Sequence, residues 1–149
     1  HYGKDHLQCG FTLSQLGAAW GILGNYEIQR DLSIKALQIF KKIPDQKHPE
    51  IARTLRELGK ACGKLGDYEA ERDFLTQALL IFEKNYGTDH LEYGVTLASL
   101  GTTWRNLGNK GRQRELHTAA LSIFEKQFGI DHPLTIQFRA DLNSLRLTQ

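Results

Sequence analysis

Four histidines recur along the chain at a step of 42 residues: His6, His48, His90 and His132. Imidazole nitrogens are common metal ligands and general bases, so a regular series of them could build a metal site. A zinc ion, however, needs its nitrogen ligands to converge on it at about 2 Å. A step this long places each histidine in a different pair of helices, roughly 10 Å from the next. We therefore expect no metal site, and a structural role for each histidine near the start of a helix.

The chain has two cysteines, Cys9 and Cys62. Two thiols do not make a disulfide framework, and Cys62 shares the repeat position of Trp20 and Trp104, which favours a core residue. The sequence has no phosphate-binding glycine loop, no nucleophile elbow and no close set of His, Cys and Asp. We expect a protein that is not an enzyme and needs no cofactor. Free thiols and the lack of a secretory leader favour a reducing, cytoplasmic setting.

A repeat of 42 residues organises the rest of the chain. The recurring positions are Leu16, Leu58 and Leu100; Gly17, Gly59 and Gly101; Gly24, Gly66 and Gly108; and Ala36, Ala78 and Ala120. Each of these alanines precedes a Leu-x-Ile-Phe run. Self-similarity at such a fixed period is typical of stacked repeats, each of which contacts its neighbours. The sequence predicts a solenoid.

Each copy predicts two helices joined by a tight turn, because apolar residues recur at helical spacing on both sides of a Gly-Asn or Gly-Asp pair. Residues expected to face inward on the first helices include Leu13, Leu16, Leu23, Leu55, Leu58, Cys62, Leu65 and Leu100. The recurring glycines remove side chains where one helix crosses another closely. The expected fold is all-α, a right-handed superhelical stack of antiparallel helix hairpins with a concave inner face.

We expect residues 1–149 to form a single solenoid domain. Residues 1–6 match the end of a repeat, so at least one further repeat is expected before them. The repeats then follow as 7–48, 49–90 and 91–132, with a polar capping helix at 133–149.

The pattern resembles the tetratricopeptide repeat (TPR), through Leu58-Gly59-x-x-Cys62, Gly66-Asp67-Tyr68 and Ala78-Leu79. The linkers Tyr86-Gly87-Thr88-Asp89-His90 and Phe128-Gly129-Ile130-Asp131-His132-Pro133 are similar to those of kinesin light chain-type repeats. The resemblance covers nearly the whole chain. It implies a noncatalytic module that binds a protein or peptide, within a larger adaptor or regulatory protein.

Two departures from the family pattern matter. Long side chains, Gln29, Glu71 and Gln113, occupy the position where a small residue is usual in the second helix, which leaves the closeness of the helix crossing open. The family's basic clamp for a terminal carboxylate is missing, since its positions hold Ser14, Ala18, Glu57, Ala98 and Thr102. An acidic chaperone tail is therefore an unexpected ligand.

The resemblance implies that one face of the first helices lines the concave groove. The candidate groove residues are Phe11, Ser14, Gln15, Ala18, Arg53, Arg56, Glu57, Lys60, Lys64, Ser99, Thr102, Arg105 and Asn106. Basic residues share one helix face in the central copy, and Phe11 offers an apolar anchor. We expect a peptide with acidic residues near Arg56, Lys60 and Lys64, although a merely solvated charged face remains the alternative.

Two other functions remain open. Binding of nucleic acid would need a continuous basic stripe, which Ser14, Glu57 and Ser99 interrupt, and the net charge is only +2. Self-association could occur through the N-terminal face, where Phe11 and Trp20 would lack a preceding repeat. No apolar run approaches the roughly 18 residues of a membrane span, so no membrane partner is expected.

Overall fold

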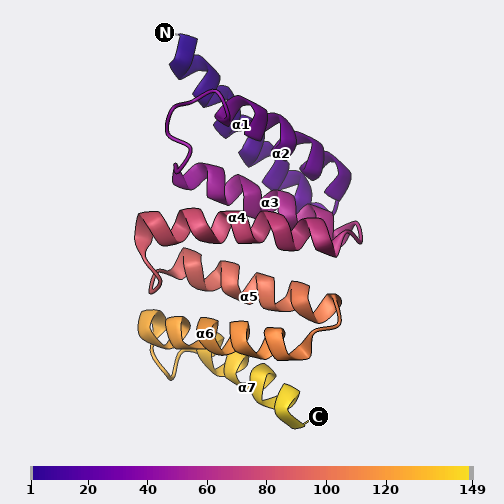
Figure 1. Ribbon diagram of the computed structural model, residues 1–149, viewed down its shortest axis with the longest axis vertical. Helices are drawn as coiled ribbons and strands as arrows, with labels where there is room; N and C mark the ends of the chain where they lie inside the picture. The colour runs from indigo at the N-terminus through magenta and orange to yellow at the C-terminus, as the bar shows by residue number, and fades with distance from the viewer. Residues whose placement is uncertain (1, 148–149) are drawn as a thin grey trace. The chain divides into compact units, whose positions relative to one another are not determined.

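The computed structural model describes residues 2–147, and these form seven helices and no strand (Figure 1). The helices are α1 (Tyr2–Ile22), α2 (Tyr26–Phe40), α3 (Pro49–Lys64), α4 (Tyr68–Tyr86), α5 (Leu91–Asn106), α6 (Lys110–Phe128) and α7 (Pro133–Leu147). Residue 1 of the expected 1–6 segment and residues 148–149 of the expected cap lie outside this described part. The predicted all-α fold of adjacent helix hairpins is confirmed.

The turn inside each hairpin has the same local cause. Gly24, Gly66 and Gly108 have φ of 84°, 93° and 88°, a region that glycine enters without steric cost. The next residue then caps the following helix, because its side-chain Oδ1 accepts a backbone N–H from the first turn. The acceptor is Asn25 Oδ1 for Ile28, Asp67 Oδ1 for Ala70 and Asn109 Oδ1 for Arg112, at 3.2, 3.0 and 2.9 Å.

Three of the recurring histidines act as helix caps. Nδ1 of His48, His90 and His132 accepts the backbone N–H two residues further on, in each case at 3.1 Å. An imidazole nitrogen thereby satisfies one of the N–H groups that a helix start leaves without an intrahelical partner. This contact is the structural role near helix starts that the sequence predicted.

The chain divides into two compact units, unit 1 (His1–Asn85) and unit 2 (Tyr86–Gln149). Unit 1 contains α1, α2, α3 and α4 up to Asn85. Its hydrophobic core consists of Ala36, Phe40, Ile51, Ala52, Leu55, Ala78 and Phe82, each at most 6% exposed. These residues come from α2, α3 and α4, and Phe11 of α1 packs on the Phe40 ring with centroids 5.6 Å apart.

Unit 2 contains α5, α6 and α7. Leu97, Leu100, Ala120, Ile123 and Leu142 are its buried hydrophobic residues. Helix α7 is attached to α6 through Phe138, whose ring meets that of Phe124 edge-on at 5.1 Å. Arg139, at a position where the earlier copies have an inward leucine, instead donates to Glu125 Oε1 at 3.0 Å.

Helix α2 ends earlier in its copy than α4 and α6 do in theirs. Pro44 explains this difference, because a proline ring within a helix collides with the carbonyl of the fourth residue before it, here Phe40. Phe40 is the last residue of α2. Its carbonyl oxygen accepts instead from the backbone N–H of Ile43 at 3.1 Å and from Gln46 Nε2 at 3.0 Å.

Three residues expected inside lie largely on the surface. Leu16, Leu23 and Leu65 are 47%, 75% and 39% exposed. The repeat equivalent of Leu16 is Leu58, which α2 and α4 enclose; the described chain offers no helix on the corresponding side of α1. Leu23 and Leu65 lie at the ends of their helices, next to the turn glycines. Helix α1 also starts at Tyr2, within the segment 1–6 that was expected to end a preceding repeat.

Candidate functional site

The two helices of each hairpin approach closely at the first glycine position. A Cβ added at Gly17, Gly59 or Gly101 would lie 3.3 Å from a backbone carbonyl oxygen of the second helix. Those carbonyls belong to Gln29, Glu71 and Gln113, the long residues that had left the crossing distance open. The crossing is therefore close in all three hairpins. In unit 1, Gly21 and Gly63 make room for the side chains of Gln29 and Glu71.

Two of the basic residues on α3 form ion pairs with acidic residues of the same helix. Arg53 Nη1 lies 2.6 Å from Glu50 Oε1, and Lys60 Nζ lies 3.5 Å from Glu57 Oε1. Glu57 also accepts a hydrogen bond from Gln29 Nε2 at 3.0 Å. Such half-exposed pairs stabilise a protein only weakly. An acidic ligand could therefore compete for these cations at small cost.

Arg56 and Lys64 differ in their surroundings on the same helix. The Arg56 guanidinium lies 5.3 Å from the centre of the Phe82 ring, within the range of a cation–π contact. Arg56 is half-buried, whereas Lys64 in the last turn is exposed. Lys64 is thus the more accessible of the two cations for a ligand.

The candidate residues on α1 lie in two different environments. Phe11 packs between the rings of Phe40 and His48, at 5.6 and 5.8 Å. Ser14 is buried, and its Oγ lies 2.7 Å from Thr54 Oγ1. Because Thr54 donates its own proton to the Glu50 carbonyl at 2.8 Å, Ser14 must be the donor to Thr54. Phe11 and Ser14 thus join helices of unit 1, while the other two candidates on α1, Gln15 and Ala18, are exposed and half-buried.

Unit 2 brings three candidate residues into one pocket. Ser99, Thr102 and Arg105 of α5 line a cavity of about 500 Å³ together with residues of α6 and α7. The other lining residues are Ala98, Gln113, His117, Phe138, Asp141, Leu142, Ser144 and Leu145. Asn106, the remaining candidate, is exposed next to Arg105 and does not line it. The pocket combines hydroxyl groups, one cation and one carboxylate with an aromatic wall.

His117 lines this pocket and is only 9% exposed. Its Nε2 lies 3.0 Å from the Ala98 carbonyl oxygen, which can only accept, so Nε2 carries a proton. Burial lowers the pKa of His117 and the charge of Arg105 lowers it further, while the bond to Ala98 and the charge of Asp141 oppose this. The imidazole is therefore neutral near neutral pH, and it meets the Phe138 ring edge-on at 5.3 Å.

Sequence reasoning missed His117, Phe138 and Asp141. The repeat offered one signal: His117 falls on the position that Ser33 and Leu75 occupy in the earlier copies. A polar, titratable residue at a core position of one copy marks a local change in packing. The other two residues lie on α7, and only the packing of α7 on α6 brings them to this place.

Within residues 6–145, the part of the chain with described side chains, no group of three potential ligands from His, Cys, Asp and Glu is placed to hold a metal ion. Among the same residues no helix is long and apolar enough to cross a membrane. Cys9 is exposed and Cys62 is buried, and neither thiol is paired. Burial, together with the negative charges of Asp67 and Glu71, raises the pKa of the Cys62 thiol. The prediction of Cys62 as a core residue is confirmed.

Comparison with solved structures shows similar folds. One is a kinesin light chain protein of Podosopora anserina with nearly identical TPR-like repeats, at a TM-score of 0.79 and 19% identity, covering 90% of this chain and 64% of that chain. Another is BtubC (BKLC) from P. vanneervenii, at a TM-score of 0.71 and 14% identity, covering 98% of this chain and 65% of that chain. The chain thus spans slightly less than two thirds of each.

Comparison with curated proteins gave no match. Two family models described as tetratricopeptide repeat match residues 11–84 and residues 95–134, which together make up more than half of the chain. The repeated glycine crossings and capped turns agree with these matches. The chain belongs to the tetratricopeptide repeat family.

Proposed function

We propose that this chain is a noncatalytic interaction module that binds a peptide segment of a partner protein, as part of a larger cytoplasmic adaptor or regulatory protein. Repeats of this family are typically protein–protein interaction modules, and their folds are generally noncatalytic scaffolds. The observation that carries the proposal is the pocket of unit 2, where Ser99, Thr102 and Arg105 lie together on the face of the first helices. The family resemblance implies that this face lines the ligand groove.

The pocket suits a peptide backbone with polar side chains. Ser99 and Thr102 supply hydroxyl groups, Arg105 supplies several N–H donors, and Asp141 accepts. Phe138 adds an aromatic surface on which an apolar side chain can pack. Such a mixture, with polar groups around an apolar wall, is common in ligand sites.

In unit 1 the proposed contact is electrostatic. The face of α3 carries Arg53, Arg56, Lys60 and Lys64 against Glu50 and Glu57, an excess of positive charge. An acidic peptide side chain near Lys60 and Lys64 would exchange a weak ion pair within the helix for a weak ion pair with the peptide. Charge on this face therefore influences partner preference and association rate more than affinity.

The test is a peptide-array screen of the parent chain and of two variants, Arg56→Glu/Lys60→Glu in unit 1 and Arg105→Glu in unit 2. We expect the first variant to lose binding of acidic peptides. We expect the second variant to lose binding of the peptides that occupy the pocket of unit 2. The matched control is Lys35→Glu/Lys42→Glu, which reverses two exposed charges that line neither site. If all variants bind the parent's peptides and remain helical, the proposed site is wrong.

A second function, self-association through α1, is favoured by one observation. Leu16 and Ile22 of this helix, and Leu23 directly after it, are 47%, 87% and 75% exposed. Exposed apolar groups gathered on one element often mark an interaction surface. Sedimentation at increasing concentration should then show dimers that Ile22→Asp abolishes. A parent chain that stays monomeric at high concentration excludes this function.

A further inference from the structure

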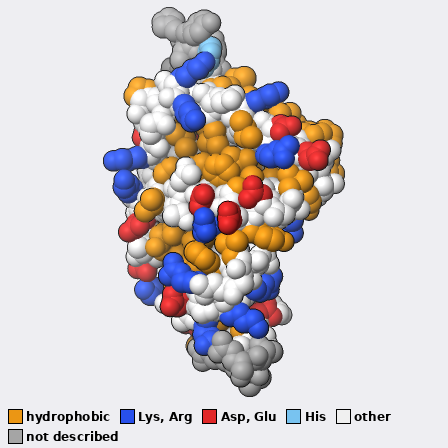
Figure 2. Space-filling model, turned by 45° about the vertical axis from the view of Figure 1, so that its right-hand side comes forward, with side chains coloured by type: hydrophobic (Ala, Val, Ile, Leu, Met, Phe, Trp, Pro, Cys, Tyr) orange, Lys and Arg blue, Asp and Glu red, His pale blue; other side chains and the backbone are white. Residues whose placement is uncertain are grey.

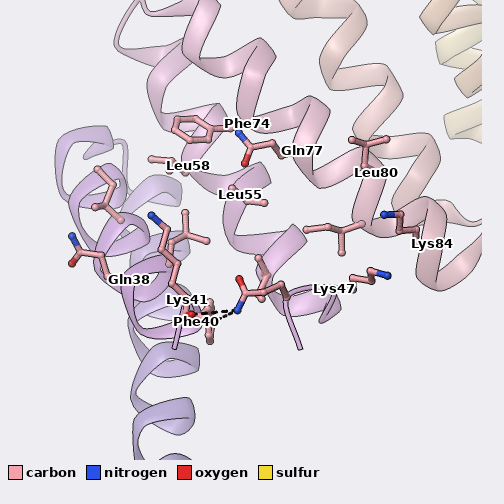
Figure 3. Close-up of a pocket in the computed structure, with 15 residues that line it drawn as sticks. Gln38, Phe40, Lys41, Lys47, Leu55, Leu58, Phe74, Gln77, Leu80 and Lys84 are labelled. Atoms are coloured by element: carbon pink, nitrogen blue, oxygen red, sulfur yellow. Dashed lines mark hydrogen bonds between the residues drawn. The ribbon is translucent and has the colours of Figure 1, made fainter. Parts of the chain in front are cut away.

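A second pocket, of about 590 Å³, lies in unit 1 between α2 and α4, with α3 along its floor (Figure 3). Leu55 and Leu58 of α3 lie at its base, and Phe74 of α4 packs beside them. Ile34 and Leu80 also line it, although they are 38% and 54% exposed. The apolar lining therefore continues onto the surface of both flanking helices. None of the candidate residues named from the sequence belongs to this pocket.

The wall at one end of the pocket is held in place by side-chain amides. Gln46 Nε2 donates to the carbonyl oxygens of Phe40 and Ile43, at 3.0 and 2.6 Å. Asn85 Nδ2 donates to the carbonyl oxygens of Lys47 and Ile81, at 2.5 and 2.8 Å. These bonds tie the loop between α2 and α3 to the ends of α2 and α4. A pocket with fixed walls needs little ordering when a ligand binds.

Three lysines surround that end of the pocket. Lys41 follows the last residue of α2, Lys47 belongs to the loop, and Lys84 lies in the last turn of α4 (Figure 3). Among residues 6–145, whose side chains the structure describes, no carboxylate forms an ion pair with any of these three lysines. The neighbouring Asp45 accepts the backbone N–H of Lys47 at 3.0 Å and does not line the pocket.

The lining contains no acidic residue at all. Figure 2 shows a broad area of hydrophobic side chains on the surface that unit 1 forms, with Lys and Arg side chains and some Asp and Glu side chains at its border. An apolar pocket whose lining has lysines at one end and no carboxylate matches a ligand that is apolar and carries negative charge at one end.

We propose that this pocket is a docking site for an amphipathic helix of a partner protein, with large apolar side chains on one face and Asp or Glu residues at one end. Helices α2 and α4 flank an apolar pocket, and a surface of this kind can receive the hydrophobic stripe of a helix. The acidic end meets Lys41, Lys47 and Lys84. The site differs from the proposed peptide-binding face, because it is lined mainly by the second helices of the hairpins.

Exposure of Ile34 and Leu80 favours a helix over an enclosed small ligand. A small acid that filled only the base would leave these two side chains in water. A helix lying over the pocket covers both of them and inserts its own side chains toward Leu55 and Leu58. Apolar residues at i, i+3, i+4 and i+7 would provide such a stripe.

The probe is a fluorescently labelled amphipathic peptide of about 18 residues, with leucines at that spacing and two glutamates at one end. A peptide of the same composition with scattered leucines serves as its control. Fluorescence anisotropy with the full chain should show binding of the first peptide only. Leu80→Glu should weaken it at least about tenfold, since a charge then occupies the apolar rim. Ile136→Glu, on an exposed isoleucine of unit 2, should leave it unchanged.

Lys84→Glu should weaken binding several-fold, and a peptide with lysines in place of its glutamates should recover it. Lys35→Glu, on α2 outside the pocket, is the matched control. Both Leu80 and Lys84 are exposed, so circular dichroism should show folded variants. No binding of the amphipathic peptide, or equal binding by Leu80→Glu, overturns the proposal. Binding of dodecanoate without binding of the peptide also overturns it, in favour of a carboxylated lipid. Dimers of the parent that Leu80→Glu dissociates overturn it in favour of a second copy.

Discussion

Each unit contains a helix crossing at the same repeat position. The backbones approach equally closely in the two crossings, but the side chains that line them differ. An added Cβ at Gly59 or Gly101 would meet a backbone carbonyl oxygen at the same 3.3 Å, so the helices approach equally closely in both units. Next to Gly59 lies the aliphatic side chain of Leu75, whereas Gly101 faces the imidazole of His117. The invariant glycine determines how close the helices come. The residue opposite it determines what the crossing contains.

The two units also differ at a second repeat position, which holds Gly21, Gly63 and Arg105 in the three copies. Gly21 and Gly63 in unit 1 leave space for the side chains of Gln29 and Glu71, while unit 2 has Arg105 at the equivalent place. Arg105 lines the pocket on the face of the first helices. The pocket of unit 1 opens instead between the second helices, where α2 ends early. Copies of one repeat thus carry pockets on different faces because a few positions differ.

The largest expected difference concerns the phenylalanine near the end of each second helix. Phe40 is 1% exposed in the core of unit 1, while its equivalent Phe124 in unit 2 is half-buried. We expect Phe40→Ala to lower the free energy of unfolding by about 3–5 kcal/mol and Phe124→Ala by less, since the smaller loss of burial leaves a smaller cavity. Urea denaturation followed by tryptophan fluorescence measures both.

Each unit contains one tryptophan, Trp20 in unit 1 and Trp104 in unit 2. Trp104→Phe and Trp20→Phe backgrounds therefore report on one unit at a time. Equal losses for the two phenylalanines would show that burial does not distinguish the two cores.

A sharper test adds one methyl group at the shared crossing. Gly101→Ala places its Cβ against the His117 ring, so the ring must move, and we expect a loss of about 1–3 kcal/mol. Gly59→Ala meets Leu75 Cγ at 3.4 Å, an ordinary contact, and the Glu71 carbonyl at a tighter 3.3 Å. Its loss should be smaller, since alanine is favoured over glycine in a helix by about 1 kcal/mol.

The double variant Gly101→Ala/His117→Ser separates the ring from the backbone. Serine is the residue that the first copy has at this position, in Ser33. If the ring is the obstacle, the two changes should be strongly non-additive, with a much smaller loss for Gly101→Ala once the imidazole is gone. Additive losses would place the obstacle at the Gln113 carbonyl instead.

Much of the fold could be predicted because its causes are local. Gly66 followed by Asp67 ends one helix and caps the next with no help from distant residues, so the hairpins follow from the sequence. The prediction that Leu16 is buried was wrong, because its repeat position is buried only where another hairpin lies beside it. Burial at the ends of a stack depends on neighbours, which a periodic pattern does not reveal.

The candidate site was predictable only in part for the same reason. Ser99, Thr102 and Arg105 share a helix face, so helical periodicity groups them. His117 and Asp141 reach the same pocket from two other helices, and no spacing along the chain shows this. The pocket between α2 and α4 depends on where Pro44 stops α2, a local signal whose consequence appears only in the packed structure.

The third prediction uses the pKa of His117 to distinguish the units by pH. Burial lowers this pKa in the folded chain, so the unfolded chain takes up the proton first as the pH falls below about 6.5. Protonation then favours the unfolded chain, and the free energy of unfolding should decrease toward acid pH. His117→Leu, which carries the residue type of Leu75 in unit 1, should remove this part of the decrease.

The measurement compares urea denaturation of the parent and the variant at neutral and mildly acidic pH, with Trp104 as the reporter. For each protein, the measured quantity is the loss of free energy of unfolding between the two pH values. The difference between the two losses is the contribution of His117, because the other titrating groups are common to both proteins. A parent and a variant that lose stability in parallel would mean that this imidazole becomes protonated equally easily in both states of the chain.

The smallest expected effect lies at the start of the second helices. Unit 1 begins α4 with Tyr68-Glu69, while unit 2 begins α6 with Lys110-Gly111. A Cβ at Gly111 would meet only Asn109 Oδ1, at 3.5 Å, so there is room for a side chain. Gly111→Ala should therefore raise the free energy of unfolding of unit 2 by about 0.5–1 kcal/mol, through the conformational freedom that glycine loses on folding.

Gly111→Glu separates that entropy from charge, because it copies Glu69 and adds a carboxylate to the first turn. A negative charge near a helix N-terminus contributes about 0.3–1 kcal/mol. This contribution should compensate for the slightly lower helix propensity of glutamate and exceed it at low salt. If the extra stability of Gly111→Glu disappears at high salt and that of Gly111→Ala does not, the first is due to charge and the second to conformational entropy. Trp104 suits the measurement because the Arg112 guanidinium lies 5.6 Å from its ring. If neither variant raises stability, the start of α6 contributes nothing to the difference between the units, and that difference lies wholly in the crossing around His117.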